Sequence, residues 1–175
     1  DGMSDALLER MLKDFPALSK EEYAAFERDK TLGGWKMLHY LLFKGVTRSM
    51  TDGMRFYGRY GVSYAEAGFR PTAEVTSIIR AAGGKAILAH PGVTLRGEAN
   101  FPRALEELAE EGADGLECWY PAHSRDVREA CLSLCRRRKL LVSAGSDCHG
   151  SFQDTQIGQT KTDMGDVSLE LLRLT

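Results

Sequence analysis

Residues 140–150 read LLVSAGSDCHG, an apolar run that stops at small residues and is followed at once by an aspartate and a histidine. The apolar run predicts a buried strand, and Gly145 and Ser146 predict its end. Asp147 and His149 are two positions apart, so an extended chain would point both to the same side. A carboxylate and an imidazole in this arrangement can ligate a metal ion, or act as a base and the group that orients it. An aspartate that caps a turn beside an unrelated histidine is the alternative, and the stretch alone does not decide between them.

The composition is that of a globular, soluble protein. The 175 residues are 43% hydrophobic and 27% charged, which is enough for one core and a small additional subdomain. No run approaches the ~18 apolar residues of a membrane span, and the first residues lack the basic start of a signal peptide. We therefore expect a cytoplasmic protein with no membrane partner. The net charge of -2 argues against bulk electrostatic capture of nucleic acid, but allows a local basic pocket.

The four cysteines do not form a recognisable metal or disulfide framework. No CxxC pair occurs, and Cys131 and Cys135 are one helical turn apart in an apolar pattern. Reduced thiols that pack in a core are therefore the predicted state of Cys118, Cys131, Cys135 and Cys148.

The first 69 residues predict a small helical unit. Ser19 followed by Glu22 is a capping-box pattern that predicts a helix start. Residues 35–43 then give a strongly apolar helix, and residues 50–60 give an amphipathic one. We take residues 1–69 as one subdomain.

Beyond residue 70, helices and strands alternate. The predicted helices are 72–82, 102–111 and 124–138, and the predicted strands are 85–89, 115–120 and 140–144. Three helix-then-strand units at near-equal spacing predict a parallel sheet or barrel with right-handed crossovers. The pattern after Gly150 is less regular, with 157–158 predicted as a last short strand and 168–174 as a terminal helix.

Side chains that can bind metals or substrates follow each of the three predicted strands. His90 ends the first strand, Glu117 and His123 lie in or just after the second, and Asp147 and His149 end the third. The carboxyl ends of parallel strands lie at one edge of a sheet, so we expect a shared site there. Nitrogen and oxygen donors suit zinc, manganese or iron, and suit hydrolysis by a metal-activated water.

Three motifs at these strand ends resemble those of a known family. They are AHPG at 89–92, GLE at 115–117 with YPAHS at 120–124, and GSDCHG at 145–150. Together they resemble the polymerase and histidinol phosphatase (PHP) family, specifically its nucleotide-phosphoesterase branch. The resemblance implies an α/β fold that is part of a distorted (β/α)7 barrel around two or three divalent metal ions (Mn, Zn or Fe). Residues 1–69 would be a helical insertion or lid, and residues 70–175 the C-terminal part of the barrel.

The resemblance also implies roles for individual residues. His90, Asp147 and His149 would be metal ligands, and Asp147 and His149 would also be the catalytic residues. Glu117 and His123 match family positions near the site, where they would bind substrate or support the ligands.

Arg96 is a further candidate for substrate binding, because a guanidinium can bind two phosphate oxygens at once. A solvated loop arginine is an equally good interpretation of this residue. Arg55 and Arg59 could also contact phosphate, but spacing does not show which arginines reach a pocket. The same holds for the aromatic residues that could contact a base, which are Phe56, Tyr57, Trp119 and Tyr120.

The chain lacks part of the family pattern. No His-x-His pair and no Asp-His motif occur, since the histidines are His39, His90, His123 and His149. We therefore expect the C-terminal part of a longer protein, which is inactive alone and binds metal weakly. Missing strands would leave a sheet edge exposed, which predicts either self-association through that edge or an open sheet whose edge is covered by the N-terminal helices.

The predicted function is that of a metal-dependent phosphoesterase, a hydrolase that acts on a phosphate ester of a nucleotide or of a short oligonucleotide end. One alternative is a small-molecule phosphomonoesterase of the histidinol phosphatase type, which should lack a large helical lid. A non-catalytic binding or regulatory module is another.

Overall fold

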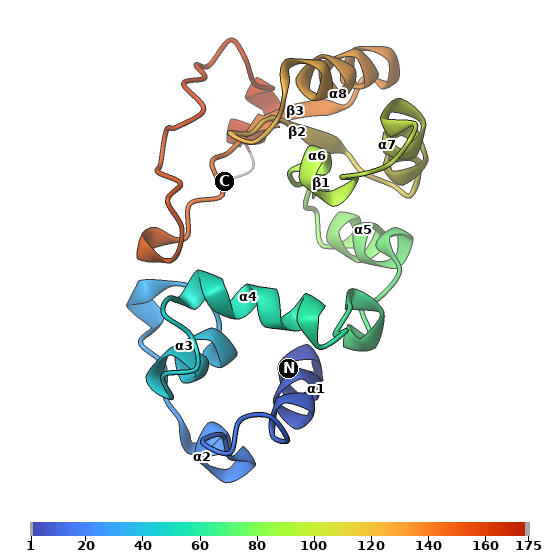
Figure 1. The fold of residues 1–175 in the computed structure, drawn as a ribbon. Coiled ribbons are helices and arrows are strands. Elements are labelled where there is room, and N and C mark those ends of the chain that lie inside the picture. The colour runs from blue at the N-terminus through green and yellow to red at the C-terminus, as the bar shows by residue number, and fades with distance from the viewer. Residues whose placement is uncertain (1, 174–175) are drawn as a thin grey trace. The chain divides into compact units, whose positions relative to one another are not determined.

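A computed structural model describes residues 2–173, with the exception of the side chains of residues 65, 66, 172 and 173. The chain divides into two compact units (Figure 1). The helical unit consists of residues 1–69 and 149–154, and the sheet unit of residues 70–148 and 155–175.

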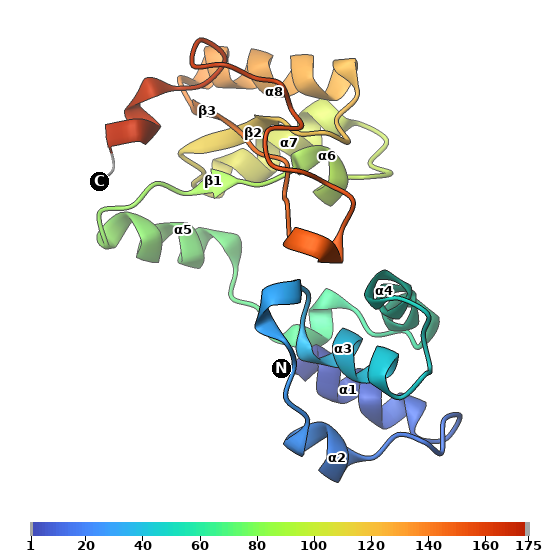
Figure 2. The ribbon, with the colours of Figure 1, turned by 90° about the vertical axis from the view of Figure 1, so that its left-hand side faces the viewer.

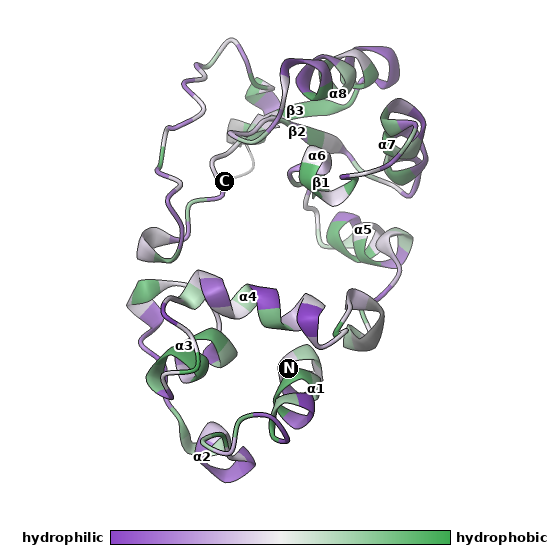
Figure 3. Ribbon diagram, viewed as in Figure 1, coloured by the Kyte–Doolittle hydropathy of each residue, from purple (hydrophilic) through white to green (hydrophobic). Residues whose placement is uncertain are grey.

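The helical unit is built from short helices. They are α1 (Gly2–Met11), α2 (Lys20–Ala25), α3 (Lys36–Phe43) and α4 (Met50–Arg59), with 3-10 turns at Lys30–Leu32, Tyr64–Ala67 and Gly150–Phe152. The predicted helices at 35–43 and 50–60 are confirmed to within a residue. In Figure 3 α3 is largely green, because most of its residues are hydrophobic, and residues 37–41 are all buried in the core of this unit. Gly53 lets α4 approach α3 closely, since a Cβ there would lie 2.6 Å from Cδ2 of Leu38.

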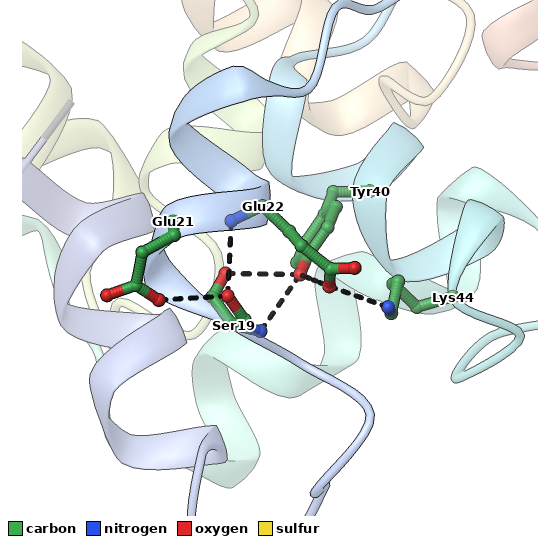
Figure 4. A network of polar contacts seen from close by, with 5 residues as sticks. All are labelled: Ser19, Glu21, Glu22, Tyr40 and Lys44. Atoms are coloured by element: carbon green, nitrogen blue, oxygen red, sulfur yellow. Dashed lines mark hydrogen bonds and ion pairs between the residues drawn. The ribbon is translucent and has the colours of Figure 1, made fainter.

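The capping box predicted at Ser19 is present in a modified form (Figure 4). Ser19 Oγ accepts a hydrogen bond from the backbone N–H of Glu22 at 3.1 Å, as the pattern predicts. The reciprocal bond differs: the backbone N–H of Ser19 donates to the Tyr40 hydroxyl at 3.0 Å instead of the Glu22 carboxylate. The Glu22 carboxylate accepts from Nζ of Lys44 at 2.7 Å. The Tyr40 hydroxyl of α3 therefore accepts the bond that the glutamate accepts in an isolated capping box, and it joins the start of α2 to α3.

The sheet unit contains the alternating elements. They are α5 (Thr72–Ala81), β1 (Ile87–Leu88), α6 (Pro91–Thr94), α7 (Phe101–Glu110), β2 (Gly115–Trp119), α8 (Arg125–Arg138), β3 (Leu141–Ala144) and a 3-10 turn at Leu169–Arg173. The three strands form one parallel sheet in the order β1-β2-β3, which confirms the predicted α/β class. Leu116 lies opposite Leu88 on one side and Val142 on the other.

Two predicted elements near the C-terminus differ from the structure. Residues 157–158 form a turn and not a strand, because Ile157 is 91% exposed and has no sheet neighbour among the described residues. The terminal helix is a 3-10 turn at Leu169–Arg173, and position 174 of the predicted helix lies outside the described residues.

The core of the sheet unit lies between β2 and the helices α7 and α8. Figure 2 shows α8 alongside the sheet, and the fully buried side chains here are Leu105, Leu116, Cys118, Cys131 and Leu134. All four cysteines are free thiols, as predicted. Hydrogen bonds with Cys131 and Cys135, together with burial, raise the pKa of Cys118, so it stays protonated.

The outer edges of the two outer strands, β1 and β3, have different surroundings. β3 is covered by Ser168, whose Oγ accepts from the Val142 N–H at 2.8 Å and whose N–H donates to the Val142 carbonyl at 2.9 Å. Beside β1, a hollow of 390 Å³ is lined mainly by apolar residues of α5, β1 and α7. Self-association through the β1 edge stays a prediction.

None of the helices in residues 2–173 combines the length and apolar character that crossing a membrane requires.

Candidate functional site

His90 follows β1 in an unusual backbone conformation. Its φ of 32° and ψ of 55° place it in the left-handed region, directly before Pro91 at the start of α6. A residue other than glycine held there costs about 1–3 kcal/mol, and such residues gather at functional sites. Nδ1 of the His90 ring is buried and has no hydrogen-bond partner among the described residues. Since buried polar atoms normally have a partner, this nitrogen is suited to a ligand such as a metal ion.

Glu117 lies in the central strand, between the ends of its two neighbours. Its Oε2 accepts the backbone N–H of His90 at 2.7 Å, which holds the turn after β1. On the other side, a Cβ at Gly145 would overlap Oε1 of Glu117, so a larger residue at that position after β3 would displace this carboxylate. Burial raises the pKa of Glu117, and the charge of Asp147 adds to this, whereas His90 opposes it. The carboxylate therefore occupies a low-dielectric position next to another negative charge.

Asp147 also adopts the left-handed conformation, with φ of 53°. The strand ends at Ala144, as predicted, but the chain is not extended at Asp147, as it would have to be to point Asp147 and His149 to the same side. The positive φ at Asp147 turns the backbone away from the strand direction, and Thr155 Oγ1 donates to the Asp147 carbonyl at 3.2 Å. The negative charge of Asp147 acts on both Glu117 and Tyr120, so the three groups lie near one another in the sheet unit.

Tyr120, one of the aromatic residues considered for substrate contacts, lies within this site. Its ring centroid lies 5.5 Å from that of His90 and 5.2 Å from that of His123. Burial raises the pKa of its hydroxyl, and the charges of Asp147 and Glu117 raise it further. Its position directly after β2, in the YPAHS motif, is the sequence signal for this placement.

Arg96 is exposed and lies beyond α6, where its backbone N–H donates to the Val93 carbonyl at 3.2 Å. Its positive charge opposes the rise in the pKa of Tyr120, which places it on the same side of the sheet unit. A guanidinium here can meet an anionic ligand without being buried.

His123 connects the end of β2 to the first turn of α6. Its Nδ1 lies 3.1 Å from the Cys118 carbonyl, and its Nε2 accepts the Gly92 N–H at 3.1 Å. The ring is therefore neutral with the proton on Nδ1. Burial lowers its pKa, although the hydrogen bond to Cys118 opposes this. With both nitrogens engaged, His123 can bind a substrate by hydrogen bonding only if one of these bonds breaks.

His149 belongs to the helical unit. It precedes the 3-10 turn Gly150–Phe152, and its ring meets that of Phe152 edge-on with centroids 6.2 Å apart. Phe152 is buried against Trp35, and a Cβ at Gly33 would overlap the carbonyl oxygen of His149. The sheet unit brings together His90, Glu117, Tyr120, His123, Asp147 and Arg96. The convergence of His149 with them stays a prediction.

The described residues do not form a complete metal site. Within residues 2–173, no three His, Cys, Asp or Glu side chains are grouped so that they could hold a metal ion. The imidazole of His90 and the carboxylate of Asp147 are suitable donor types, but protein sites use more donors than these two.

Comparisons with known proteins give the class of protein. The chain is 37% identical over 70 residues to the phosphoribosyl 1,2-cyclic phosphate 1,2-diphosphodiesterase of Eggerthella lenta, a match that covers 40% of this chain and 25% of the relative. It is 30% identical over 121 residues to the 5'-3' exoribonuclease Rnm of Escherichia coli, which covers 69% of this chain and 41% of the relative. The crystal structure of a candidate metal-dependent phosphoesterase from Bifidobacterium adolescentis superimposes with a TM-score of 0.63 at 26% identity, over 91% of this chain and 57% of that one. No model of a known protein family matches the chain.

The chain is thus a partial match to phosphoesterases of the PHP family, and the resemblance indicated by the three motifs is confirmed. It spans less than half the length of the two curated relatives that it matches. Its α/β fold with a small parallel sheet is that of part of a phosphoesterase.

Proposed function

We propose that this chain is part of a metal-dependent phosphoesterase that hydrolyses a phosphate ester of a nucleotide or of the end of a short oligonucleotide. The observation that best supports this is the buried, unpartnered Nδ1 of His90, a residue that follows β1 and whose backbone N–H is held by the Glu117 carboxylate of the neighbouring parallel strand. The names of the two relatives, an exoribonuclease and a cyclic phosphate diphosphodiesterase, support the reaction class.

In this proposal His90, Asp147 and His149 supply metal ligands, and Asp147 and His149 act in catalysis. Two or three bound Mn, Zn or Fe ions would supply an activated water and offset charge on the phosphoryl oxygens. Glu117 fixes the turn at His90 through the backbone N–H, so it determines where the imidazole points.

The substrate would meet the exposed side of the same strand ends. Arg96 would bind phosphate oxygens, and the Tyr120 hydroxyl could donate a hydrogen bond because its raised pKa keeps it protonated. His123 would position α6 and, through it, the turn at His90. The three strands would be the C-terminal part of a distorted (β/α)7 barrel, and the helical unit its insertion or lid.

Two alternatives have specific support. A small-molecule phosphomonoesterase of the histidinol phosphatase type shares the donor types, and the relative from Eggerthella lenta is named for a small phosphoribosyl substrate. A binding or regulatory module fits the incomplete grouping of metal donors among residues 2–173.

The test is a hydrolysis panel on the protein encoded by the complete reading frame. With Mn²⁺ present, we expect release of nucleotide from short 5'-phosphorylated RNA or of phosphate from nucleoside bisphosphates, and no such release by the Asp147→Asn variant. Asp126→Asn, in the first turn of α8, is the matched control and should keep the activity. Preferential hydrolysis of histidinol phosphate would favour the first alternative, and inactivity on every substrate would favour the second.

A further inference from the structure

The helical unit contains a basic pocket that the proposed function does not use. Its volume is 510 Å³, and its lining comes from α4 and the segment before it: Val46, Thr47, Arg48, Asp52, Arg55, Phe56 and Arg59. The size is within the range of small-molecule sites in proteins. Three arginines and one aspartate leave an excess of two positive charges in this lining.

Thr47 provides an observation that is independent of charge. The residue is only 8% exposed, and its Oγ1 is buried with no hydrogen-bond partner among the described residues. Leaving a buried hydroxyl without a partner costs about 1–3 kcal/mol. Thr47 is one of the residues that line the pocket, so a ligand whose acceptor atoms reach Oγ1 would supply the partner.

The arginines are available to bind such a ligand. Arg55 has an 85% exposed side chain and only a long contact with Asp52, at 3.9 Å between Nη1 and Oδ1. Arg59 lies over the Phe56 and Tyr60 rings, with its guanidinium carbon 5.8 and 6.0 Å from their centroids. These stacked rings limit the movement of the guanidinium without neutralising it.

We infer that this pocket binds a phosphate group. A tetrahedral oxyanion can accept hydrogen bonds from the Thr47 hydroxyl and from several guanidinium forks at once, and arginine is the preferred residue for phosphate. The excess of positive charge over Asp52 favours an anion over a neutral acceptor. The inference concerns binding by the helical unit and does not depend on the proposed hydrolytic activity.

The experiment is a binding titration of the 175-residue chain, by calorimetry, with three probes. The first probe is inorganic phosphate, which is free phosphate. The second is adenosine monophosphate, a phosphate monoester, and the third is a short single-stranded RNA with hydroxyl ends, which contains only phosphodiesters. We expect at least one probe to bind, and the tightest of the three identifies the source of the phosphate. Arg55→Gln and Arg59→Gln should each weaken that binding about tenfold, since a charge-assisted hydrogen bond is lost.

The Thr47 variants separate binding from folding. Thr47→Val keeps the shape and removes the hydroxyl, so it should weaken binding several-fold while the unfolding midpoint stays the same or rises. Thr47→Ser keeps a hydroxyl and should keep the binding. Arg125→Gln, an exposed arginine in α8, is the charge-matched control and should bind like the parent.

The inference is overturned if none of the three probes binds. It is also overturned if binding survives Thr47→Val and both arginine substitutions, or if Arg125→Gln weakens it as much as they do.

Discussion

Replacing His123 with alanine should destabilise the sheet unit, because the ring joins β2 to α6 through two hydrogen bonds. Both bonds measure 3.1 Å, one to the Cys118 carbonyl and one from the Gly92 N–H. Their loss leaves two partly buried backbone groups without a partner and removes the ring that packs against Gly92. Each bond contributes about 1 kcal/mol and the cavity adds to this, so the free energy of unfolding should fall by about 2–4 kcal/mol.

Urea unfolding followed by Trp119 fluorescence measures this change. Trp119 belongs to the sheet unit, so a Trp35→Phe background removes the signal of the helical unit from both proteins that are compared. With a slope of about 2 kcal/mol per M, the midpoint should fall by about 1–2 M. His123→Gln can still accept the Gly92 N–H through its amide oxygen and should lose less. An alanine variant that unfolds at the parent midpoint would refute the bridging role of the ring.

Two further substitutions test contacts made directly before β2 and directly after β3. Burial raises the pKa of the Asp114 carboxyl, but the hydrogen bond from the Ala86 N–H and the charge of Arg80 outweigh burial and leave the pKa below its ordinary value of 3.8. The carboxylate therefore stabilises the fold above pH 3.8, and this contribution is lost as the pH falls through the folded-state pKa. The stability gap between the parent and Asp114→Asn, measured in urea across that range, should therefore narrow at low pH, and a constant gap would contradict the pairing. Gly145→Ala places a Cβ on Oε1 of Glu117, so we expect a loss of about 1–3 kcal/mol in a thermal unfolding assay, and an unchanged midpoint would show that the close approach is absent.

Much of the fold could be predicted because the chain carries strong local signals. α8 begins one residue after its predicted cap, since Ser124 Oγ accepts the Val127 N–H at 3.3 Å, and it ends at Arg138 as predicted. β1 comprises only residues 87–88 of the predicted 85–89, and at its carboxyl end the chain turns into the left-handed region at His90. The prediction of a strand at 157–158 was wrong, because an apolar residue beside glycine indicates a strand only where other strands bury it.

The candidate site could be predicted only in part. The succession of polar residues at strand ends placed His90, Glu117 and Asp147 in one region, because parallel strands end on the same side. The positive φ at His90 and at Asp147 could not be predicted, since non-glycine residues rarely adopt it and only tertiary contacts hold them there. Tyr120 could be named only as one of several aromatic candidates, because an aromatic residue after a strand more often belongs to a core.

The central claim is that the strand ends of the sheet unit supply ligands to a metal centre of a phosphoesterase. The most direct measurement is the amount of bound Mn²⁺ and Zn²⁺ in the protein encoded by the complete reading frame, determined by mass spectrometry of the metals after removal of loose ions. The parent should retain metal, and His90→Gln and Asp147→Asn should each retain measurably less while Asp126→Asn keeps the parent amount. Equal metal content in the parent and in both ligand variants would contradict the claim.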